Sequence, residues 1–244
     1  MSALKLNKES TYHHDSITTV LDHGYVRLLD VMGNDLTIVN SARTSYDKES
    51  QELDNKDIGL LNYLMKHKHY SPLRHAVMAF EIYAPLMVKN QWIKHLVGSS
   101  HVDSQFGWNE SSRRYVTEEL EYYTPMLFSE APESSKQGAG GIVDQATNEW
   151  MQDKIEHIQF LGSMHYEQAL EKGIAPEQAR LLLPAYGLYV RWRWVASLDA
   201  TLNFINLRLG EGAQNEIVEY ARVIADYTYA NFPETMLAYS EHAN

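Results

Sequence analysis

The sequence predicts an α+β fold in which helices flank a mixed or antiparallel sheet. Three segments have the composition and alternation of strands, and helical segments separate them without the regular repetition of βαβ units. A chain of 244 residues buries roughly 73% of its unfolded surface, so one large core is expected without disulfides or a structural metal. We expect a single domain over residues 1–244, with residues 1–15 as a frayed lead-in and residues 129–141 as a mobile loop.

Two strands and three helices are expected in the first half of the chain. Val26 and Leu28 alternate with Tyr25 and Arg27, as in a half-buried strand. The segment AVMAFEIYA is rich in strand formers and apolar on both faces, so it is expected at the centre of the sheet. The expected elements are a strand at 25–30, a helix at 37–42, a helix at 57–67 capped by Asp57, the central strand at 76–84 and a helix at 85–97.

The second half is expected to contain one strand among four helices. In YGLYVRWRWV, Trp192 and Trp194 fall on one face and Arg191 and Arg193 on the other. The first expected helix, at 147–172, has an apolar stripe through Met151, Ile155, Ile158 and Leu161. A short helix from Pro176 and a strand at 186–195 follow. The last two expected helices are at 198–209, with Ser197 as N-cap and Gly210 as C-cap, and at 213–231.

Composition excludes several classes of site. The chain has no cysteine, which rules out disulfides, thiolate metal sites and a cysteine nucleophile. Its 32 acidic and 21 basic residues give a net charge of −11, which disfavours nucleic acid and anionic membranes as partners. His67, His69 and His75 match no metal-binding spacing, so no metal is expected. The N-terminus has no secretory apolar region and no run is long enough to span a membrane, so we expect a cytoplasmic protein.

Three polar clusters could bind an anion despite the negative net charge. Gln91, Lys94 and His95 share one face of the helix expected at 85–97. The segment WNESSRRY at 108–115 combines two arginines with two serines, and an arginine fork with hydroxyl groups suits phosphate. A third cluster lies on the helix after Ser197, where polar residues precede Arg208. Each cluster, taken alone, is equally compatible with a solvated surface.

Several blocks of sequence carry a family resemblance when they are taken together. They are GYVRLLDVMGNDLTIVNSARTSY, SPLRHAVMAFEIYAPLMVKNQW, QWIKHLV, NESSRRY, QARLLLP, SLDATLNFINLR and AQNEI, in this order over nearly the whole chain. The set resembles the flavin-dependent thymidylate synthases, whose signature is RHR followed by SxNExSxRY. The resemblance implies that family's α+β fold, a homotetramer, and flavin sites built from several subunits.

The activity implied by the resemblance is reductive methylation of dUMP to dTMP. Methylenetetrahydrofolate would supply the carbon, reduced FAD the hydride, and NADPH would regenerate the reduced flavin. The lack of cysteine agrees with this, because the other thymidylate synthase route attacks the uracil ring with a cysteine thiolate. The implied partners are a uridylate, a folate and further copies of the chain.

The resemblance also implies roles for individual residues. Arg208 would be catalytic, since it would lie against the uracil ring and stabilise negative charge on it. The implied dUMP contacts are Gln91, Lys94, Glu110, Ser111, Ser112, Arg114, Arg180 and Arg208. The implied FAD contacts are Ser71, Lys94, His95, Asn109, Glu110, Ser197 and Asn203, with His69 as a weaker candidate.

Three departures from the family pattern leave other functions open. Lys94-His95-Leu96 replaces RHR, 11 residues separate Val97 from Asn109, and Arg74 stands where an acidic residue is usual. One alternative is a UMP/dUMP 5-methylase of a specialised pathway on the same fold. Another is a homologue that binds flavin or nucleotide without methyl transfer, and a third is an acidic interaction domain whose arginines form surface pairs.

Overall fold

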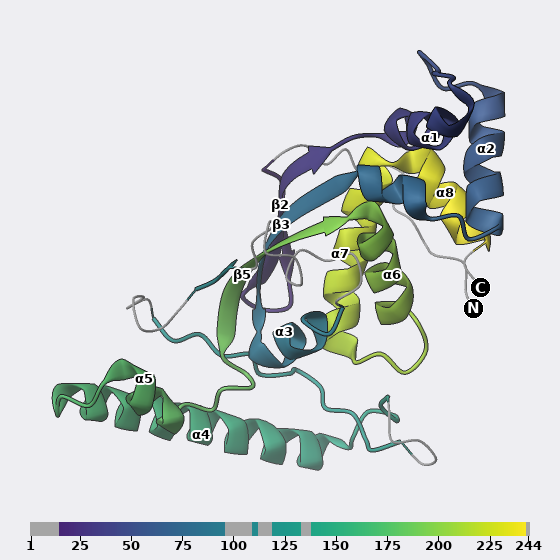
Figure 1. Cartoon of the computed structure of the whole chain (residues 1–244). Coiled ribbons are helices and arrows are strands. Elements are labelled where there is room, and N and C mark those ends of the chain that lie inside the picture. Colours follow the sequence, from purple (N-terminus) through teal and green to yellow (C-terminus); the bar gives the residue numbers. More distant parts are fainter. Residues whose placement is uncertain (1–14, 96–108, 112–118, 133–137, 243–244) are drawn as a thin grey trace.

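The computed structural model describes residues 15–95, 109–111, 119–132 and 138–242 (Figure 1). Within these ranges, a five-stranded sheet has the order β1-β2-β3-β5-β4, and each neighbouring pair is antiparallel. The strands are β1 (Ile17–Val20), β2 (Gly24–Met32), β3 (Val77–Pro85), β4 (Asn109–Glu110) and β5 (Tyr189–Ser197). The expected α+β class with an antiparallel sheet is confirmed.

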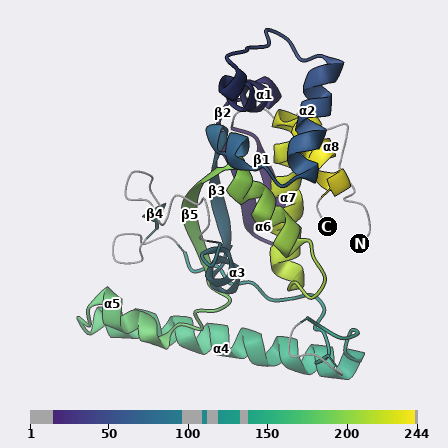
Figure 2. The same cartoon turned by 45° about the vertical axis from the view of Figure 1, so that its right-hand side comes forward.

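The helices fall into three groups around the sheet (Figures 1 and 2). One group packs at the end of β2 and consists of α1 (Asp35–Arg43), η1 (Thr44–Tyr46), α2 (Asn55–Lys66), η2 (Ser71–His75) and α8 (Pro233–His242). A second group covers one face of the sheet and consists of α3 (Leu86–Trp92), α6 (Leu198–Arg208) and α7 (Asn215–Asn231). The third group consists of α4 (Gln145–Glu171), α5 (Pro176–Ala179) and η4 (Arg180–Leu182).

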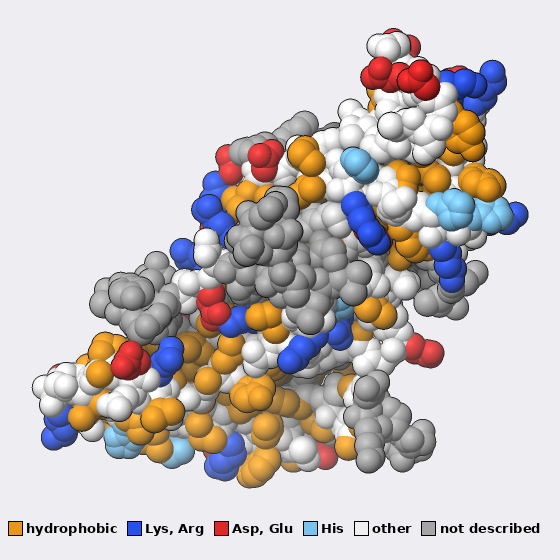
Figure 3. All heavy atoms as spheres, in the orientation of Figure 1, with side chains coloured by type: hydrophobic (Ala, Val, Ile, Leu, Met, Phe, Trp, Pro, Cys, Tyr) orange, Lys and Arg blue, Asp and Glu red, His pale blue; other side chains and the backbone are white. Residues whose placement is uncertain are grey.

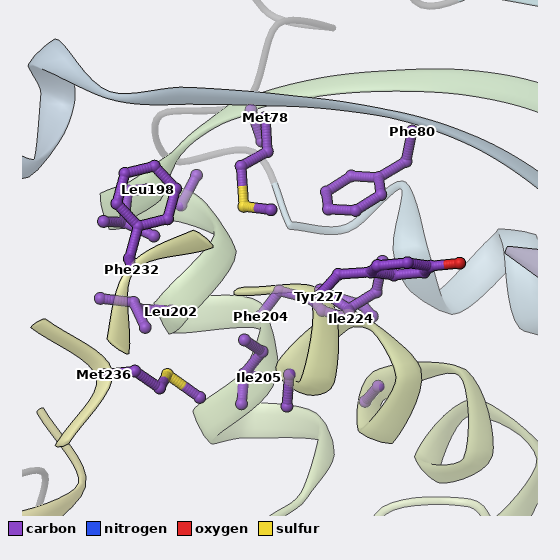
Figure 4. Close-up of a cluster of buried hydrophobic side chains, with 14 of the residues drawn as sticks. Met78, Phe80, Leu198, Leu202, Phe204, Ile205, Ile224, Tyr227, Phe232 and Met236 are labelled. Carbon is purple, nitrogen blue, oxygen red and sulfur yellow. The ribbon is translucent and has the colours of Figure 1, made fainter. Parts of the chain in front are cut away.

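The main core lies between the sheet and the helices α6 and α7 (Figure 4). Alternate residues of β3, among them Met78 and Phe80, point into it, and Phe80 stacks on Trp194 of β5 with ring centroids 5.8 Å apart. The expected apolar stripe of α7, which includes Ile224, is fully buried. Burial of aromatic rings from both layers fixes α6 against the sheet, and α6 carries much of the candidate site.

The opposite face of β3 carries charge at its centre, so the expectation that β3 is apolar on both faces is wrong. Glu81 is flanked by Arg27 on β2 and Arg193 on β5 in the strand register. Arg193 Nε donates to Glu81 Oε2 over 3.3 Å, and Tyr25 donates to Oε1 over 3.0 Å. The central position of β3 itself is confirmed.

The long helix α4 stands apart from the main core (Figure 2). It contacts η4 through Gly162, where an added Cβ would lie 2.8 Å from Leu182 O, and a small cluster including Tyr166 and Leu188 joins it to the start of β5. The expected apolar stripe of α4 is not a core stripe, because Ile158 is exposed and the other three residues are half-buried. No helix in the described ranges has the length and apolar character needed to cross a bilayer.

The ends of the segment 129–141 are hydrogen-bonded to each other. Glu130 N donates to Gly141 O over 2.8 Å, and Gly140 N donates to Glu130 O over 2.9 Å. At the N-terminus, Asp15 pairs with Arg27 at 2.6 Å. Residues 1–14 and 133–137 of the expected lead-in and loop lie outside the described residues.

Several expected boundaries are wrong for local reasons. Asp54, not Asp57, caps α2. Asp57 is the third residue of the helix, and its side chain accepts a hydrogen bond from the backbone of Asp54 in a reciprocal capping box. The strand β5 begins at Tyr189 rather than at 186, and α6 ends at Arg208 with Leu209 as its C-cap rather than Gly210.

Several elements were not expected from the sequence, namely β4, the short 3₁₀ helices and two further elements. The first, β1, pairs with β2 through a turn in which Leu21 has a φ of 58°, where glycine or asparagine would be the usual signal. The second, α8, starts where the buried carboxylate of Asp35 accepts hydrogen bonds from Glu234 N and Thr235 N.

Candidate functional site

The turn that follows α3 brings candidate residues to one corner of the molecule. The helix ends at Trp92, earlier than expected, because Lys94 N and His95 N donate to carbonyls only three residues back, those of Gln91 and Trp92. The tighter turn separates the side chains, so the expectation that Gln91, Lys94 and His95 share one face is wrong. Lys94 is exposed, Gln91 is half-buried and His95 is buried.

Arg208, in the last turn of α6, meets His95 at this corner. Arg208 Nε donates to His95 Nε2 over 2.7 Å, and the imidazole packs edge-on against Phe204 with centroids 5.0 Å apart. Partial burial lowers the pKa of Arg208 from its ordinary value, because desolvation disfavours the cation. Among the described residues, no carboxylate pairs with Arg208, so its terminal N–H groups remain available to a ligand.

A glutamine pair fixes the amide of Gln91. Gln91 Nε2 donates to Gln214 Oε1, and Gln214 Nε2 contacts Met87 Sδ at 3.6 Å. Gln214 immediately precedes α7, and sequence reasoning assigned it no role although it lies in the block AQNEI. The pair joins α3 to the start of α7.

The two residues of β4 point to opposite faces of the sheet. Glu110 pairs in register with the buried Trp192, lies on the helix side and forms an ion pair with Lys89 of α3. Asn109 pairs in register with Arg193 on the other face. Adjacent strand residues point to opposite faces, so the side chains of the two implied FAD contacts lie on different faces of the sheet edge. Sequence reasoning missed Lys89 because its partner is 21 residues away.

Further candidates lie along the polar face of α6. Ser197 caps the helix by accepting from Ala200 N over 3.2 Å, and Asp199 of the first turn pairs with Arg74 of η2. Asn203 follows Asp199 by one turn on the same face. Exposed Ser71 begins η2, which packs against α6. Arg208 lies nine residues after Asp199, so at 3.6 residues per turn it lies about half a turn away from the face that carries Asp199 and Asn203.

The other uridylate candidates are separated from this corner. Arg180 begins η4, which follows α5 at one end of α4, away from the C-terminal end of α6 in both views (Figures 1 and 2). Its Nε donates to Glu177 O over 3.2 Å. Ser111 donates its N–H to Arg191 O over 2.8 Å beside β5. Ser112 and Arg114 lie outside the described residues.

The histidines near the end of α2 form an aromatic group. His67 packs on Tyr63 with ring centroids 4.4 Å apart, and His69 lies 6.2 Å from His67. In the part of the chain that the structure describes, no group of three or more histidine, aspartate, glutamate or cysteine side chains could hold a metal ion.

Known proteins resemble this chain over most of its length. The family model described as thymidylate synthase complementing protein matches residues 27–234. A flavin-dependent thymidylate synthase of Thermotoga neapolitana is 38% identical over 224 residues, covering 92% of this chain and 94% of the relative. One of Thermus thermophilus is 37% identical over 224 residues, covering 91% of this chain and 78% of the relative.

A solved structure has a similar fold. The UMP/dUMP methylase PolB of Streptomyces cacaoi, bound with 5-Br dUMP, superposes with a TM-score of 0.77 at 25% identity and covers 92% of this chain and 97% of its own. The family match and the relatives extend over most of the chain, including the α3 turn and α6. The chain therefore belongs to the flavin-dependent thymidylate synthase family.

Proposed function

We propose that this protein catalyses the reductive methylation of dUMP to dTMP. Methylenetetrahydrofolate supplies the carbon, and NADPH supplies the reducing equivalents. The observation that carries the proposal is Arg208, a half-buried cation whose described partner is a neutral imidazole. Such a group is suited to stabilise negative charge on a uracil ring, because its own charge is not neutralised by a carboxylate.

The remaining nucleotide contacts follow from the charges available around Arg208. Gln91 offers the amide that Gln214 orients, and exposed Lys94 offers a point charge for the phosphate. Glu110, Ser111, Ser112, Arg114 and Arg180 complete the proposed uridylate set.

The polar residues of α6 and η2 are assigned to the flavin in this proposal. Asn203 lies on the polar face of α6, Ser197 caps the start of that helix, Ser71 begins the neighbouring η2, and His95 contacts the C-terminal end of α6. Asn109, Glu110 and Lys94 complete the proposed FAD set. When bound there, FAD supplies hydride for reduction of the transferred carbon, and the protein positions and polarises the reactants.

We further propose that the site is completed in a homotetramer. Arg180 and Arg208 lie on separate surfaces of one chain, and Asn109 and Glu110 point to opposite faces of the sheet. The α4–α5 region also exposes apolar side chains, including Phe160 and Leu181 (Figure 3). Monomers rarely leave such contiguous apolar surface uncovered, so a second copy is a suitable partner for it.

Mixing of two inactive variants tests whether one site takes residues from two copies of the chain. Arg180→Ala and Arg208→Ala are each expected to be inactive. If a site takes Arg180 from one copy and Arg208 from another, random re-association of the two variants restores about a quarter of the sites. Mixed oligomers that stay inactive, while a wild-type and wild-type mixture treated in the same way recovers, would contradict the shared site.

An anaerobic assay tests the activity itself. The reaction mixture contains the protein, dUMP, methylenetetrahydrofolate, FAD and NADPH. The nucleotide product is identified by mass spectrometry, and dTMP is the expected product. UMP in place of dUMP tests the second candidate, a UMP/dUMP methylase, with which the similarity to PolB is consistent. Flavin binding without a methylated product from either nucleotide would indicate a homologue that has lost methyl transfer.

A further inference from the structure

The guanidinium of Arg208 is held by an acceptor that carries no charge. The 2.7 Å contact joins Arg208 Nε, which always bears a proton, to His95 Nε2. Nε2 must therefore offer its lone pair, so the proton of the neutral ring resides on Nδ1. The contact thus specifies both the charge and the tautomer of His95.

The imidazole is fixed in place by its surroundings. His95 is 6% exposed, and its ring meets Phe204 at an interplanar angle of 74°. Phe204 in turn stacks on the fully buried Trp92, with centroids 4.2 Å apart. The backbone of His95 is bonded to Trp92 O over 3.0 Å. The acceptor therefore belongs to the rigid aromatic core rather than to a surface side chain.

We propose that His95 is a positioning residue for Arg208, orienting the guanidinium without neutralising it; this inference rests on the proposed function. One N–H of Arg208 is used by the imidazole, and the structure gives no protein acceptor among the described residues for the other four donors, which leaves them for the proposed uridylate. A carboxylate at position 95 would hold the same N–H but would cancel the positive charge that the reaction uses. A neutral acceptor keeps the orientation and the charge together.

Three substitutions separate orientation, charge and packing. His95→Gln keeps an acceptor at a similar distance from the backbone, His95→Phe keeps the ring against Phe204 without an acceptor, and His95→Glu keeps an acceptor but adds negative charge. We expect His95→Phe and His95→Glu to lower kcat by about tenfold to a hundredfold, since a small misplacement or loss of charge has effects of that size. His95→Gln should recover most of this loss.

A purely structural role predicts the reverse order, because phenylalanine preserves the ring packing better than glutamine does. A role only in flavin contact would appear as a weaker affinity for FAD, measured by fluorescence titration, rather than as a lower kcat at saturating FAD. If His95→Phe turns over as fast as His95→Gln, or if FAD affinity accounts for the losses, the proposal is wrong.

Nuclear magnetic resonance gives a readout independent of turnover. In protein labelled with 15N-histidine, the signal of His95 is the one that is present in the wild type and absent from His95→Gln. We expect its chemical shift to report an unprotonated Nε2. The same signal should shift in Arg208→Ala, which removes the donor. A protonated Nε2 would overturn the proposal even in an active enzyme. Conversely, an unprotonated Nε2 in a protein that forms no dTMP would support the contact and refute the proposed function instead.

Discussion

Arg74 and Asp199 form an ion pair that joins η2 to the first turn of α6, with Arg74 Nε and Asp199 Oδ2 3.0 Å apart. The Arg74 side chain is 62% exposed and that of Asp199 only 14%. Arg74 was noted as a departure from the family pattern, and its partner is 125 residues away in sequence. The pair links two segments that both carry proposed flavin contacts, Ser71 and Asn203.

A charge swap should show that this pair is coupled. Asp199→Arg is expected to destabilise more than Arg74→Glu, because Asp199 also interacts favourably with the positive end of the α6 dipole. The double variant should recover only the interaction between the two side chains, about 0.5–1 kcal/mol for a surface pair in which Arg74 is exposed. Denaturant unfolding of the four proteins measures these differences. Strict additivity of the two single changes would contradict the coupling.

Arg208→Ala should abolish turnover without unfolding the protein. Removal of the group proposed to stabilise charge on the ring is expected to lower methylation by about two to three orders of magnitude. Arg222→Ala is a matched control, because Arg222 is exposed on α7 and pairs with Glu219. Near-normal turnover of Arg208→Ala, or equal losses in both variants, would refute the assignment.

Asp57 should make the protein more stable above about pH 4 than below it. Its side chain is 1% exposed, and although burial by itself raises the pKa, the hydrogen bond from Arg43 and others lower the pKa overall. The folded state thus favours the carboxylate. The stability that it contributes is complete above the unfolded pKa and is lost as pH falls through the folded pKa.

Asp57→Asn is the direct test of that pH dependence. At pH 7 we expect a loss of about 1.5–3 kcal/mol, typical of a hydrogen bond to a charged group. The difference from wild type should shrink as the pH falls below 4, measured by denaturant unfolding across pH. Asp153→Asn, at a fully solvated carboxylate beside Lys154, serves as control and should change little. A difference that stays constant down to acid pH would contradict the assignment.

The exposed apolar surface of α4 and η4 should hold copies of the chain together. Phe160 is 66% exposed and Leu181 is 85% exposed. Replacing both with glutamate should lower the mass measured by light scattering and reduce activity together, since buried apolar area drives such association. Leu53→Glu, at an exposed leucine outside this region, should leave the mass unchanged. An unaltered mass for the double variant would place the interface elsewhere.

The local pattern of residues was sufficient for most of the secondary structure. Alternation identified β2 and β5, the content of strand-forming residues identified β3, and helical spacing identified the buried stripe of α7. These signals are local, since side-chain periodicity follows from the geometry of each element. The family was also recognisable from ordered blocks of sequence, because they lie along almost the whole chain.

Contacts between distant residues decided what the sequence left open. The start of α8 depends on Asp35, about two hundred residues upstream, and the packing of His95 against Phe204 and Arg208 depends on how α6 docks on the sheet. No local pattern encodes such pairings, because each is formed only when separate elements are packed together. The sequence by itself therefore determined most of the elements, the family and the candidate residues. Tertiary structure decided which of those residues meet in one chain and which face another surface.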